Sequence, residues 1–369
     1  MVEIYSKNRL AFKIIGKSQR SLGTMQTEVC FRQEFYFYLA KYDKTAKPNM
    51  GRSMKNIISF LFLVFIVKLA AYGQQDPQYT NNMFYKLGIN PGFAGAENTI
   101  NGLILNRYQW SGMEGAPKTL VFSVDAAMNI FGAPGGIGLN VVSDQLGFYE
   151  NTSVGASYAF KTRTSLGNLG IGLYFGILNQ NINGDWYIPE DGFGIYTPSG
   201  SDPGIPQGEV SQVAFDAGFG LYLSTNKYYL GASVTHLNQA EIKFDGDSRV
   251  YMARHYYFSG GYNIKLSDPL FELRPSFLLK SDLASWQLDL NTNVVFDERF
   301  WGGISYRIQD AVAVLLGMEM ENGLRFGYSF DLVTSSIRHY GFASHEVFVS
   351  YSLDLEKNRN QKYKSIRFL

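Results

Sequence analysis

From about residue 99 onward, apolar side chains alternate with polar or small ones along the chain. The segment 323–332 shows the pattern clearly: one set of alternate positions holds Leu324, Phe326, Tyr328 and Phe330, and the other holds Arg325, Gly327, Ser329 and Asp331. Because successive side chains of a strand point to opposite faces of a sheet, this period of two predicts strands whose faces meet different surroundings.

Fourteen segments carry this alternation, and most contain ten or more residues. Strands of soluble proteins average about five or six residues, whereas a tilted strand needs about 9 to 11 to cross a bilayer. An even number of strands suits a bacterial barrel closed from hairpins, in which every edge hydrogen bond is satisfied in lipid. The sequence therefore predicts an all-β fold, a transmembrane antiparallel up-and-down β-barrel over residues 99–355. The fourteen predicted strands are 99–110, 117–128, 136–145, 151–163, 168–180, 211–224, 227–238, 253–266, 270–280, 285–296, 299–309, 311–320, 323–332 and 346–355.

The connectors between these strands alternate in length. Short connectors follow even-numbered strands, at 225–226, 267–269, 297–298 and 321–322. The longest connectors follow odd-numbered strands, at 181–210, 239–252 and 333–345. Outer-membrane barrels have short periplasmic turns and longer outer loops. We therefore expect both barrel termini to be periplasmic, with the basic tail 356–369 beside them.

A short apolar run precedes the barrel. From Met54 the sequence reads MKNIISFLFLVFIVKLAAYG, in which a basic start is followed by an unbroken apolar stretch and then small residues. The stretch is too short for a spanning helix, which needs about 20 residues, so we interpret 54–73 as a secretory signal peptide. Residues 1–53 are then an upstream extension outside the mature protein. The alternatives are a start at Met50, or a cytoplasmic arm before an uncleaved anchor.

Removing these segments changes the charge. The whole chain has a formal charge of +1, but from Gln74 onward there are 21 Lys and Arg against 28 Asp and Glu, a net charge of −7. The single cysteine, Cys30, lies upstream, so the mature part has no disulfide framework, thiolate metal site or cysteine nucleophile. An acidic, exported chain also argues against nucleic-acid binding.

The inward set of alternate positions is dominated by small and polar residues with scattered charges. We expect opposite charges to pair across a small, hydrated interior; the alternative is a selectivity filter for a solute. The sequence does not say whether the lumen is open. The inward charges are Asp125, Asp216, Arg274, Asp289, Arg307, Arg325, Asp331 and Asp354.

Candidate chemistry is sparse. The four histidines, at 236, 255, 339 and 345, form no HExxH motif and no pair on one strand face, so we expect no metal and no cofactor. A hydrolase needs a histidine beside a serine, and the only local candidates are Ser336 with His339 and Ser344 with His345. Both pairs lie in the last outer loop, which we interpret as a polar surface. We therefore predict that the protein is not an enzyme.

The longest outer loop, within 181–210, is rich in Gly, Pro and Asp. Its acidic residues do not follow the spacing of an EF-hand, so we interpret it as an outer loop rather than a calcium site. Loops of this length commonly contact partners. The candidate partner-binding residues are Trp186, Tyr187, Asp191 and Tyr196.

Two stretches after the signal peptide carry a family pattern: QDPQYTNNMFYKLGINPGFAG at 75–95 and NRYQWSGMEGAPKTLVFSVDAAM at 106–128. They resemble the N-terminal signature of the PorP/SprF family, from the type IX secretion system of Bacteroidetes. The resemblance continues through 135–160 and more loosely to the C-terminus, where Ile366 replaces the proline expected in the closing KSIRFL. The motif residues are Asp76, Pro77, Asn90, Pro91, Gly95, Arg107, Trp110, Gly115, Pro117 and Thr119.

Asn90-Pro91-Gly92 is a turn signal, since Pro fixes φ and Gly admits positive φ. We therefore expect the segment 74–98 to be folded, either in the periplasm or within the lumen.

The resemblance implies a non-enzymatic outer-membrane component of the type IX secretion system. Such a component binds, exports or anchors specific C-terminally tagged cargo, such as a gliding-type adhesin. Its partners would be the C-terminal domain of the cargo, other secretion components and outer-membrane lipid. The sequence identifies neither the cargo nor the stoichiometry of the complex. The alternatives are an outer-membrane channel or transporter for a small or hydrophobic solute and, third, a lipid hydrolase.

Overall fold

The structure is a computed structural model that describes residues 76–97, 99–130, 132–184, 208–243 and 249–354. The upstream extension, the signal peptide and the basic tail lie outside the described residues. So do Trp186, Tyr187, Asp191 and Tyr196 of the longest loop.

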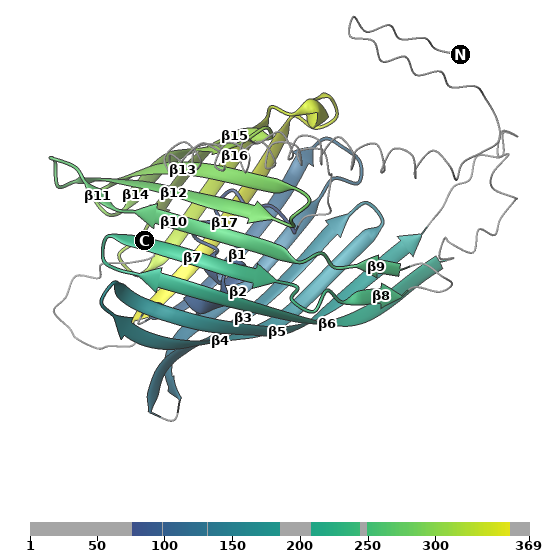
Figure 1. Cartoon of the computed structure of the whole chain (residues 1–369). Helices are drawn as coiled ribbons and strands as arrows, with labels where there is room; N and C mark the ends of the chain where they lie inside the picture. The colour runs from purple at the N-terminus through teal and green to yellow at the C-terminus, as the bar shows by residue number, and fades with distance from the viewer. Residues whose placement is uncertain (1–75, 98, 131, 185–207, 244–248, 355–369) are drawn as a thin grey trace, which may run out of the picture. The chain divides into compact units, whose positions relative to one another are not determined.

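Fourteen long strands pair in chain order and form one antiparallel sheet (Figure 1). The first and last strands also pair, from Thr99 opposite Asp354 to Tyr108 opposite His345, so the sheet is a closed barrel. Every predicted strand corresponds to one of these, which confirms the fourteen-stranded antiparallel barrel. The strands are β1 (Thr99–Ser111), β2 (Lys118–Ile130), β3 (Ala133–Leu146), β4 (Tyr149–Thr164), β5 (Gly167–Gly184), β6 (Gly208–Ser224), β7 (Tyr228–Thr235), β10 (His255–Tyr262), β12 (Phe271–Ser281), β13 (Trp286–Phe296), β14 (Phe300–Arg307), β15 (Ala311–Glu319), β16 (Leu324–Val333) and β17 (Ala343–Asp354).

Three short strands accompany the barrel. β8 (Glu241–Lys243) and β9 (Arg249–Tyr251) form a two-stranded sheet in the loop between β7 and β10, and β11 (Ile264–Lys265) pairs with β12. The sequence predicted the loop 239–252 but not β8 and β9, because segments of three residues are too short to show a period, whereas β11 lies within the predicted strand 253–266. A four-residue 3-10 helix, η2 (Ser336–His339), lies in the loop before β17.

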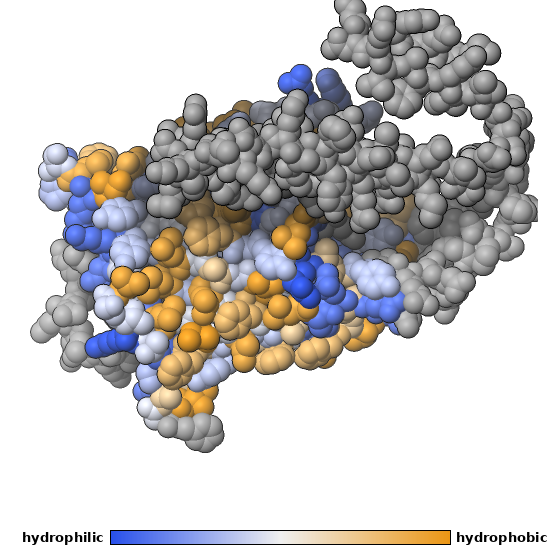
Figure 2. Space-filling model, viewed as in Figure 1, coloured by the Kyte–Doolittle hydropathy of each residue, from blue (hydrophilic) through white to orange (hydrophobic). Residues whose placement is uncertain are grey.

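On the face that Figure 2 shows, apolar side chains are spread over the outer wall of the barrel. In β5, Ile171, Leu173, Phe175 and Ile177 are 38% to 56% exposed, while the residues between them are glycines or less exposed. This is the alternation that a strand with one lipid-facing side requires.

The two faces of β1 are now assigned. Ile104 and Tyr108 face outward, each about half exposed, whereas Leu103, Arg107 and Gln109 are buried on the lumen side. The sequence alone does not assign these faces, because Leu103 and Ile104 are both apolar. Among the described residues, no helix is both long and apolar enough to span a bilayer.

Residues 76–97, which we call the plug, lie inside the ring of strands. They contain α3 (Lys86–Ile89) and η1 (Pro91–Phe93), and from 80 to 97 every residue except Gly88 and Ala96 is buried. Hydrogen bonds join the plug to strands around the ring, including β3, β7, β10, β13, β14 and β17. Of the two locations left open by the sequence, the described part of this segment occupies the lumen.

The plug runs along the length of the lumen. Its first residue, Asp76, contacts His236 and His255 at the end of the barrel that carries the long loops, which we call the loop end. Further along the plug, Gly95 donates its backbone N–H to Asp125 of β2. Asp125 lies in the half of β2 that is nearer the opposite end of the barrel, where β1 begins and β17 ends. The chain therefore descends through the barrel before it forms the first strand.

Glycines in the wall make room for η1. A Cβ on Gly172 of β5 would lie 2.3 Å from the backbone of Pro91 and Gly92, and one on Gly220 of β6 would lie 2.1 Å from Oδ1 of Asn90. Asn90 uses that oxygen to accept the N–H of Gly92 at 2.8 Å. These distances allow no side chain at either wall position, so the small inward residues form the seat of the plug.

The turn interpretation of Gly92 is wrong in one respect. Its φ is not positive; instead a Cβ there would lie 2.9 Å from the carbonyl oxygens of Gly170 and Gly220, so close approach to the wall is what requires glycine. Within the plug, Gly95 is the glycine with positive φ, at 59°.

Gly172→Val is expected to displace η1 and destabilise the barrel by about 3 kcal/mol, the upper end of the usual cost of overpacking. The control is Gly102→Val on the outward face of β1, where an added Cβ meets no atom within 4 Å. Urea-induced unfolding in detergent micelles measures both variants. Equal midpoints for the two would contradict the seating of the plug on these glycines.

Candidate functional site

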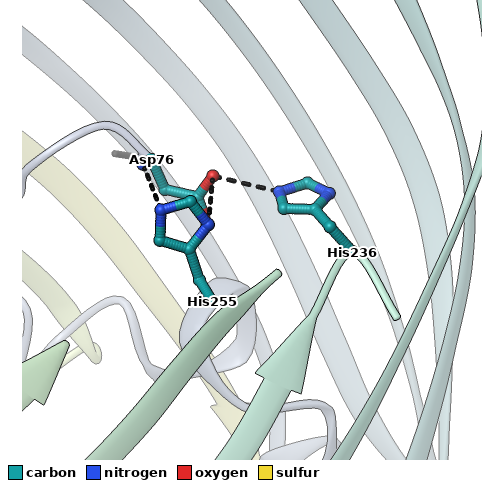
Figure 3. Close-up of side chains that lie close together, drawn as sticks. All are labelled: Asp76, His236 and His255. Carbon is teal, nitrogen blue, oxygen red and sulfur yellow. Dashed lines mark hydrogen bonds and ion pairs between the residues drawn. The ribbon is translucent and has the colours of Figure 1, made fainter. Parts of the chain in front are cut away.

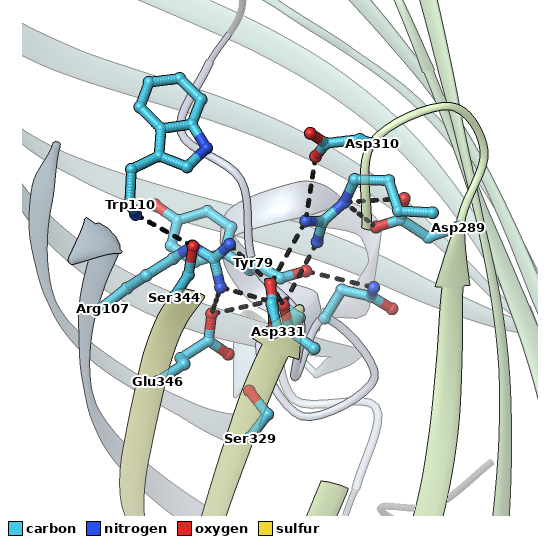
Figure 4. Close-up of polar contacts among 12 residues, drawn as sticks. Tyr79, Arg107, Trp110, Asp289, Asp310, Ser329, Asp331, Ser344 and Glu346 are labelled. Carbon is cyan, nitrogen blue, oxygen red and sulfur yellow. Dashed lines mark hydrogen bonds and ion pairs between the residues drawn. The ribbon is translucent and has the colours of Figure 1, made fainter. Parts of the chain in front are cut away.

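Two polar clusters fix the plug to the barrel wall, and the first surrounds Arg107 (Figure 4). The Arg107 guanidinium, on β1, donates to Asp331 of β16 at 2.8 Å and to Glu346 of β17 at 3.1 Å, and all three side chains are 1% exposed or less. Thr80 of the plug donates its hydroxyl to Asp331 at 2.7 Å and its N–H to Glu346 at 2.9 Å. Charges that would be costly to bury alone are thus paired, and they hold the plug.

Arg307 of β14 extends this cluster. Its guanidinium lies 3.1 Å from Asp289 and 3.4 Å from Asp331, and it donates to the hydroxyl of Thr80 at 3.2 Å. The prediction that opposite charges pair inside the barrel is therefore confirmed. The predicted inward charges that are buried are Asp125, Asp216, Arg274, Asp289, Arg307, Arg325 and Asp331; the side chain of Asp354 lies outside the described part.

The second cluster joins Asp76, His236 and His255 at the loop end (Figure 3). His236 Nε2 lies 3.0 Å from Oδ1 of Asp76, and His236 Nδ1 lies 3.0 Å from Oδ1 of Asp216. His255 Nε2 accepts the backbone N–H of Asp76 at 3.2 Å. One plug residue is therefore held by two histidines of the wall.

Three further wall residues bind Asp76. Tyr257 donates its hydroxyl to the carboxylate at 2.7 Å, and the Thr235 hydroxyl donates to the same oxygen at 3.3 Å. Lys280 Nζ donates to the backbone carbonyl of Asp76 at 3.0 Å. The carboxylate, the backbone N–H and the backbone carbonyl of Asp76 therefore all have hydrogen-bond partners in the wall.

The sheet register brings the two histidines together. His236 directly follows β7, and His255, the first residue of β10, pairs with Thr235. The two residues therefore flank one loop of the barrel although they are distant in sequence. Sequence reasoning missed this because it sought ligands on one strand face, whereas adjacency of strand ends was the available signal.

The electrostatics of the cluster favour an imidazolium. Burial alone would lower the pKa of His236, but the carboxylates of Asp76 and Asp216 raise it to about 10. Burial alone would raise the pKa of Asp76, but His236, His255 and the Tyr257 hydroxyl hold it well below its usual value. Without a metal, His236 is therefore charged at neutral pH and lies between two carboxylates.

A cavity of about 200 Å³ lies between the plug and the wall beside both clusters. Its lining combines apolar and aromatic side chains, such as Leu87, Tyr174 and Leu178, with the polar groups of Asp76 and His236. A space of this size admits an ion with its waters or a small organic group, not a folded chain.

The structure places most of the family-pattern residues in the lumen. Asp76 and Arg107 belong to the two clusters, Pro77 lines the cavity, and Thr119 donates its hydroxyl to Asp144 at 2.6 Å. The others in the lumen belong to the plug: Asn90, Pro91 and Gly95.

Trp110, Gly115 and Pro117 instead lie at the connection from β1 to β2, at the loop end of the barrel. Trp110 has a φ of 50° and donates its N–H to the Ser344 hydroxyl at 3.1 Å. Gly115 has a φ of 71°, and its carbonyl accepts the N–H of Gly147 at 2.9 Å. Pro117 accepts the N–H of Gln109 at 3.0 Å. These residues shape the loop end rather than the plug contacts.

The hydrolase alternative gains nothing from the geometry of Ser344 and His345. They are successive residues of β17 and therefore point to opposite faces. Ser344 faces the lumen and is 1% exposed, whereas His345 contacts the Tyr328 hydroxyl on the other face.

Thr80, Asn81 and Glu346 were not singled out from the sequence, because nothing local distinguishes a residue that meets a strand about 250 positions away.

The sequence profile of the type IX secretion system membrane proteins PorP/SprF matches residues 71–351, which includes the plug and nearly all of the barrel. The chain belongs to the PorP/SprF family. This confirms the resemblance seen in the sequence. Together, family and fold indicate an outer-membrane protein with a role in type IX secretion, and neither is that of a known enzyme family.

Solved structures similar to this PorP/SprF protein are outer-membrane barrels. The toluene transporter TodX of Pseudomonas putida is 13% identical, with a TM-score of 0.44 and coverage of 78% of this chain and 97% of TodX. The outer membrane protein Omp33 of Acinetobacter baumannii is 7% identical, with a TM-score of 0.39 and coverage of 71% and 100%. Among curated proteins, none matches this chain.

Proposed function

We propose that this PorP/SprF protein is a non-enzymatic outer-membrane component of the type IX secretion system that binds the C-terminal domain of specific cargo. The cargo class is a secreted, C-terminally tagged protein such as a gliding-type adhesin, which the barrel helps to export or anchor. Other secretion components and outer-membrane lipid are its further partners. In this proposal the loop end faces outward and both barrel termini face the periplasm.

The observation that carries the proposal, beside the family, is the filled lumen. Thr80 and Asn81 of the plug are completely buried, and their partners lie on β16 and β17, whereas other plug residues bond to β3 and β7 on other parts of the ring. A barrel whose interior is occupied by its own chain is better suited to binding at its rim than to passive diffusion.

The loop end offers aromatic side chains for such binding. Tyr340 and Phe342, in the loop before β17, are 75% and 66% exposed, and Tyr251 of β9 is 59% exposed. Exposed aromatic residues are typical anchors of protein interfaces. Trp186, Tyr187, Asp191 and Tyr196 are proposed to belong to the same binding surface.

Deleting the gene is expected to remove one or a few C-terminally tagged proteins from the cell surface or the culture fluid, while nutrient uptake persists. Mass spectrometry of both fractions measures this. An unchanged set of surface proteins in the deletion strain would refute the proposal. Affinity capture of the barrel from detergent, followed by mass spectrometry, then identifies the cargo.

The double substitution Tyr340→Ala and Phe342→Ala is expected to weaken capture of that cargo at least about tenfold, since losing aromatic anchors commonly costs 2 kcal/mol or more. The matched control is Tyr306→Ala with Phe326→Ala, which removes the same residue types from the outward wall, where they are 47% and 36% exposed. Equal capture by the two variants would place the binding surface elsewhere.

The cavity beside the plug is the observation that favours the alternative, a channel or transporter for a small or hydrophobic solute. That alternative predicts single-channel steps from the intact protein in planar bilayers and a growth defect of the deletion strain on one solute. Both results together, with unchanged surface proteins, would replace the secretion proposal.

A further inference from the structure

The cluster of Asp76, His236 and His255 has the donor set of a transition-metal site. Each residue offers one ligand atom, and these atoms lie within 4.8 Å of one another. Two imidazole nitrogens with one carboxylate oxygen suit Zn²⁺ and similar divalent ions, whereas Ca²⁺ and Mg²⁺ prefer oxygen ligands alone. The three residues come from the plug and from the two ends of one barrel loop (Figure 3).

The partner of His236 behind the site strengthens this assignment. His236 Nδ1 lies 3.0 Å from Asp216, so it donates its proton there and turns Nε2 toward Asp76. Metal-binding histidines commonly have a carboxylate in this outer position, which fixes the ring and its tautomer. Nε2 and the Asp76 oxygen lie 3.0 Å apart, which is close enough for both to bind the same metal ion.

His255 is oriented in a similar way. Its Nδ1 lies 2.9 Å from the carbonyl oxygen of Ala253, so it donates there and leaves a lone pair on Nε2. That lone pair now accepts the N–H of Asp76 over 3.2 Å, which is a long hydrogen bond. A metal ion bound at Nε2 replaces this contact, while Nδ1, which also lies 3.6 Å from Oδ1 of Asp76, keeps its contact with Ala253.

The surroundings favour a divalent cation. The site borders the cavity of about 200 Å³, which leaves room for a water as a fourth ligand. With His236 neutral, the cavity wall carries a charge of −2, because two bases face four acids: Lys280 and Arg307 against Asp76, Asp144, Asp216 and Asp289.

We propose that Asp76, His236 and His255 bind one divalent transition-metal ion, Zn²⁺ by its donor set, and that the ion ties the start of the plug to the barrel wall at the loop end. This site is independent of cargo binding and depends only on a seated plug.

Isothermal titration of tag-free, chelator-treated protein in detergent tests the proposal with Zn²⁺ alone. We expect one Zn²⁺ per chain, a higher thermal unfolding midpoint when the metal is present, and loss of both effects in His236→Gln and His255→Gln. Asp216→Asn keeps all three ligands and is expected to bind about 10- to 100-fold more weakly. The control is His339→Gln in η2, which removes a loop-end histidine outside the site.

Absence of stoichiometric Zn²⁺ binding, or equal binding by His236→Gln, His255→Gln and His339→Gln, would overturn the proposal. Migration of unheated samples in detergent gels reports whether each variant is a folded barrel. If the ligand variants do not fold, the visible spectrum of the wild-type protein with added Co²⁺ tests the site instead. A tetrahedral visible spectrum supports the site, and no spectral change overturns it.

Discussion

Arg107→Met is expected to lower the free energy of unfolding by about 3–5 kcal/mol, the usual effect of removing one member of a buried ion pair. Arg107 is 1% exposed and forms ion pairs with Asp331 and Glu346 inside the barrel. The substitution keeps much of the side-chain volume but leaves Glu346 without its cation. Two backbone N–H groups of the plug still donate to the Glu346 carboxylate, but these hydrogen bonds do not replace a full positive charge. Urea-induced unfolding in detergent micelles, followed by tryptophan fluorescence, measures the loss.

The matched control is Arg299→Met at a turn between β13 and β14. Arg299 is half exposed and pairs with Asp297 and Glu321, so its loss should cost about 0–1 kcal/mol. Adding Glu346→Gln to Arg107→Met should recover part of the stability, because the uncompensated carboxylate is then removed. A loss no greater than that of the control would show that the cluster does not hold the plug.

Deleting residues 77–96 is expected to turn a non-conducting barrel into one that shows resolved single-channel steps in planar bilayers. The deletion removes the segment that occupies the lumen, and the wall it exposes is polar, with buried groups such as Asn101, Asp125 and Asn140 that water can hydrate. Asp331 and Glu346 keep Arg107 as their partner, so the emptied barrel retains its main ion pairs.

The control for this deletion removes residues 186–205, an equal length of the longest connection between strands. It tests whether shortening the chain by itself produces conductance. Steps from the wild-type protein, or steps only from the loop deletion, would show that the plug is not the barrier and would favour the channel alternative.

The strands were predictable because their signal is local. In 323–332, each lipid-facing residue is followed by one that faces the lumen, and the fourteen such segments correspond to the fourteen strands of the barrel. The face of β1 that meets lipid was not predictable, since Leu103 and Ile104 are equally apolar and only the neighbouring strands distinguish them.

The site was only partly predictable. Arg107 and Asp76 stood out through the family pattern, and the inward charges through the period of two, but their partners did not. Glu346 meets Thr80 and Arg107 because β17 closes the barrel against β1, and no local pattern encodes that closure. His236 and His255 meet because β7 and β10 are neighbours.

The order of apolar and polar residues by itself determined a closed antiparallel barrel, its number of strands and, outside β1, the inward position of the charged side chains. Only the tertiary structure decided what fills the barrel. Gly172 and Gly220 read as ordinary small residues in the sequence, yet their missing side chains admit the backbone of Pro91 and Gly92. The physical reason is that alternation follows from geometry between adjacent residues, whereas the fit of the plug depends on distances between atoms that the chain brings together from far apart.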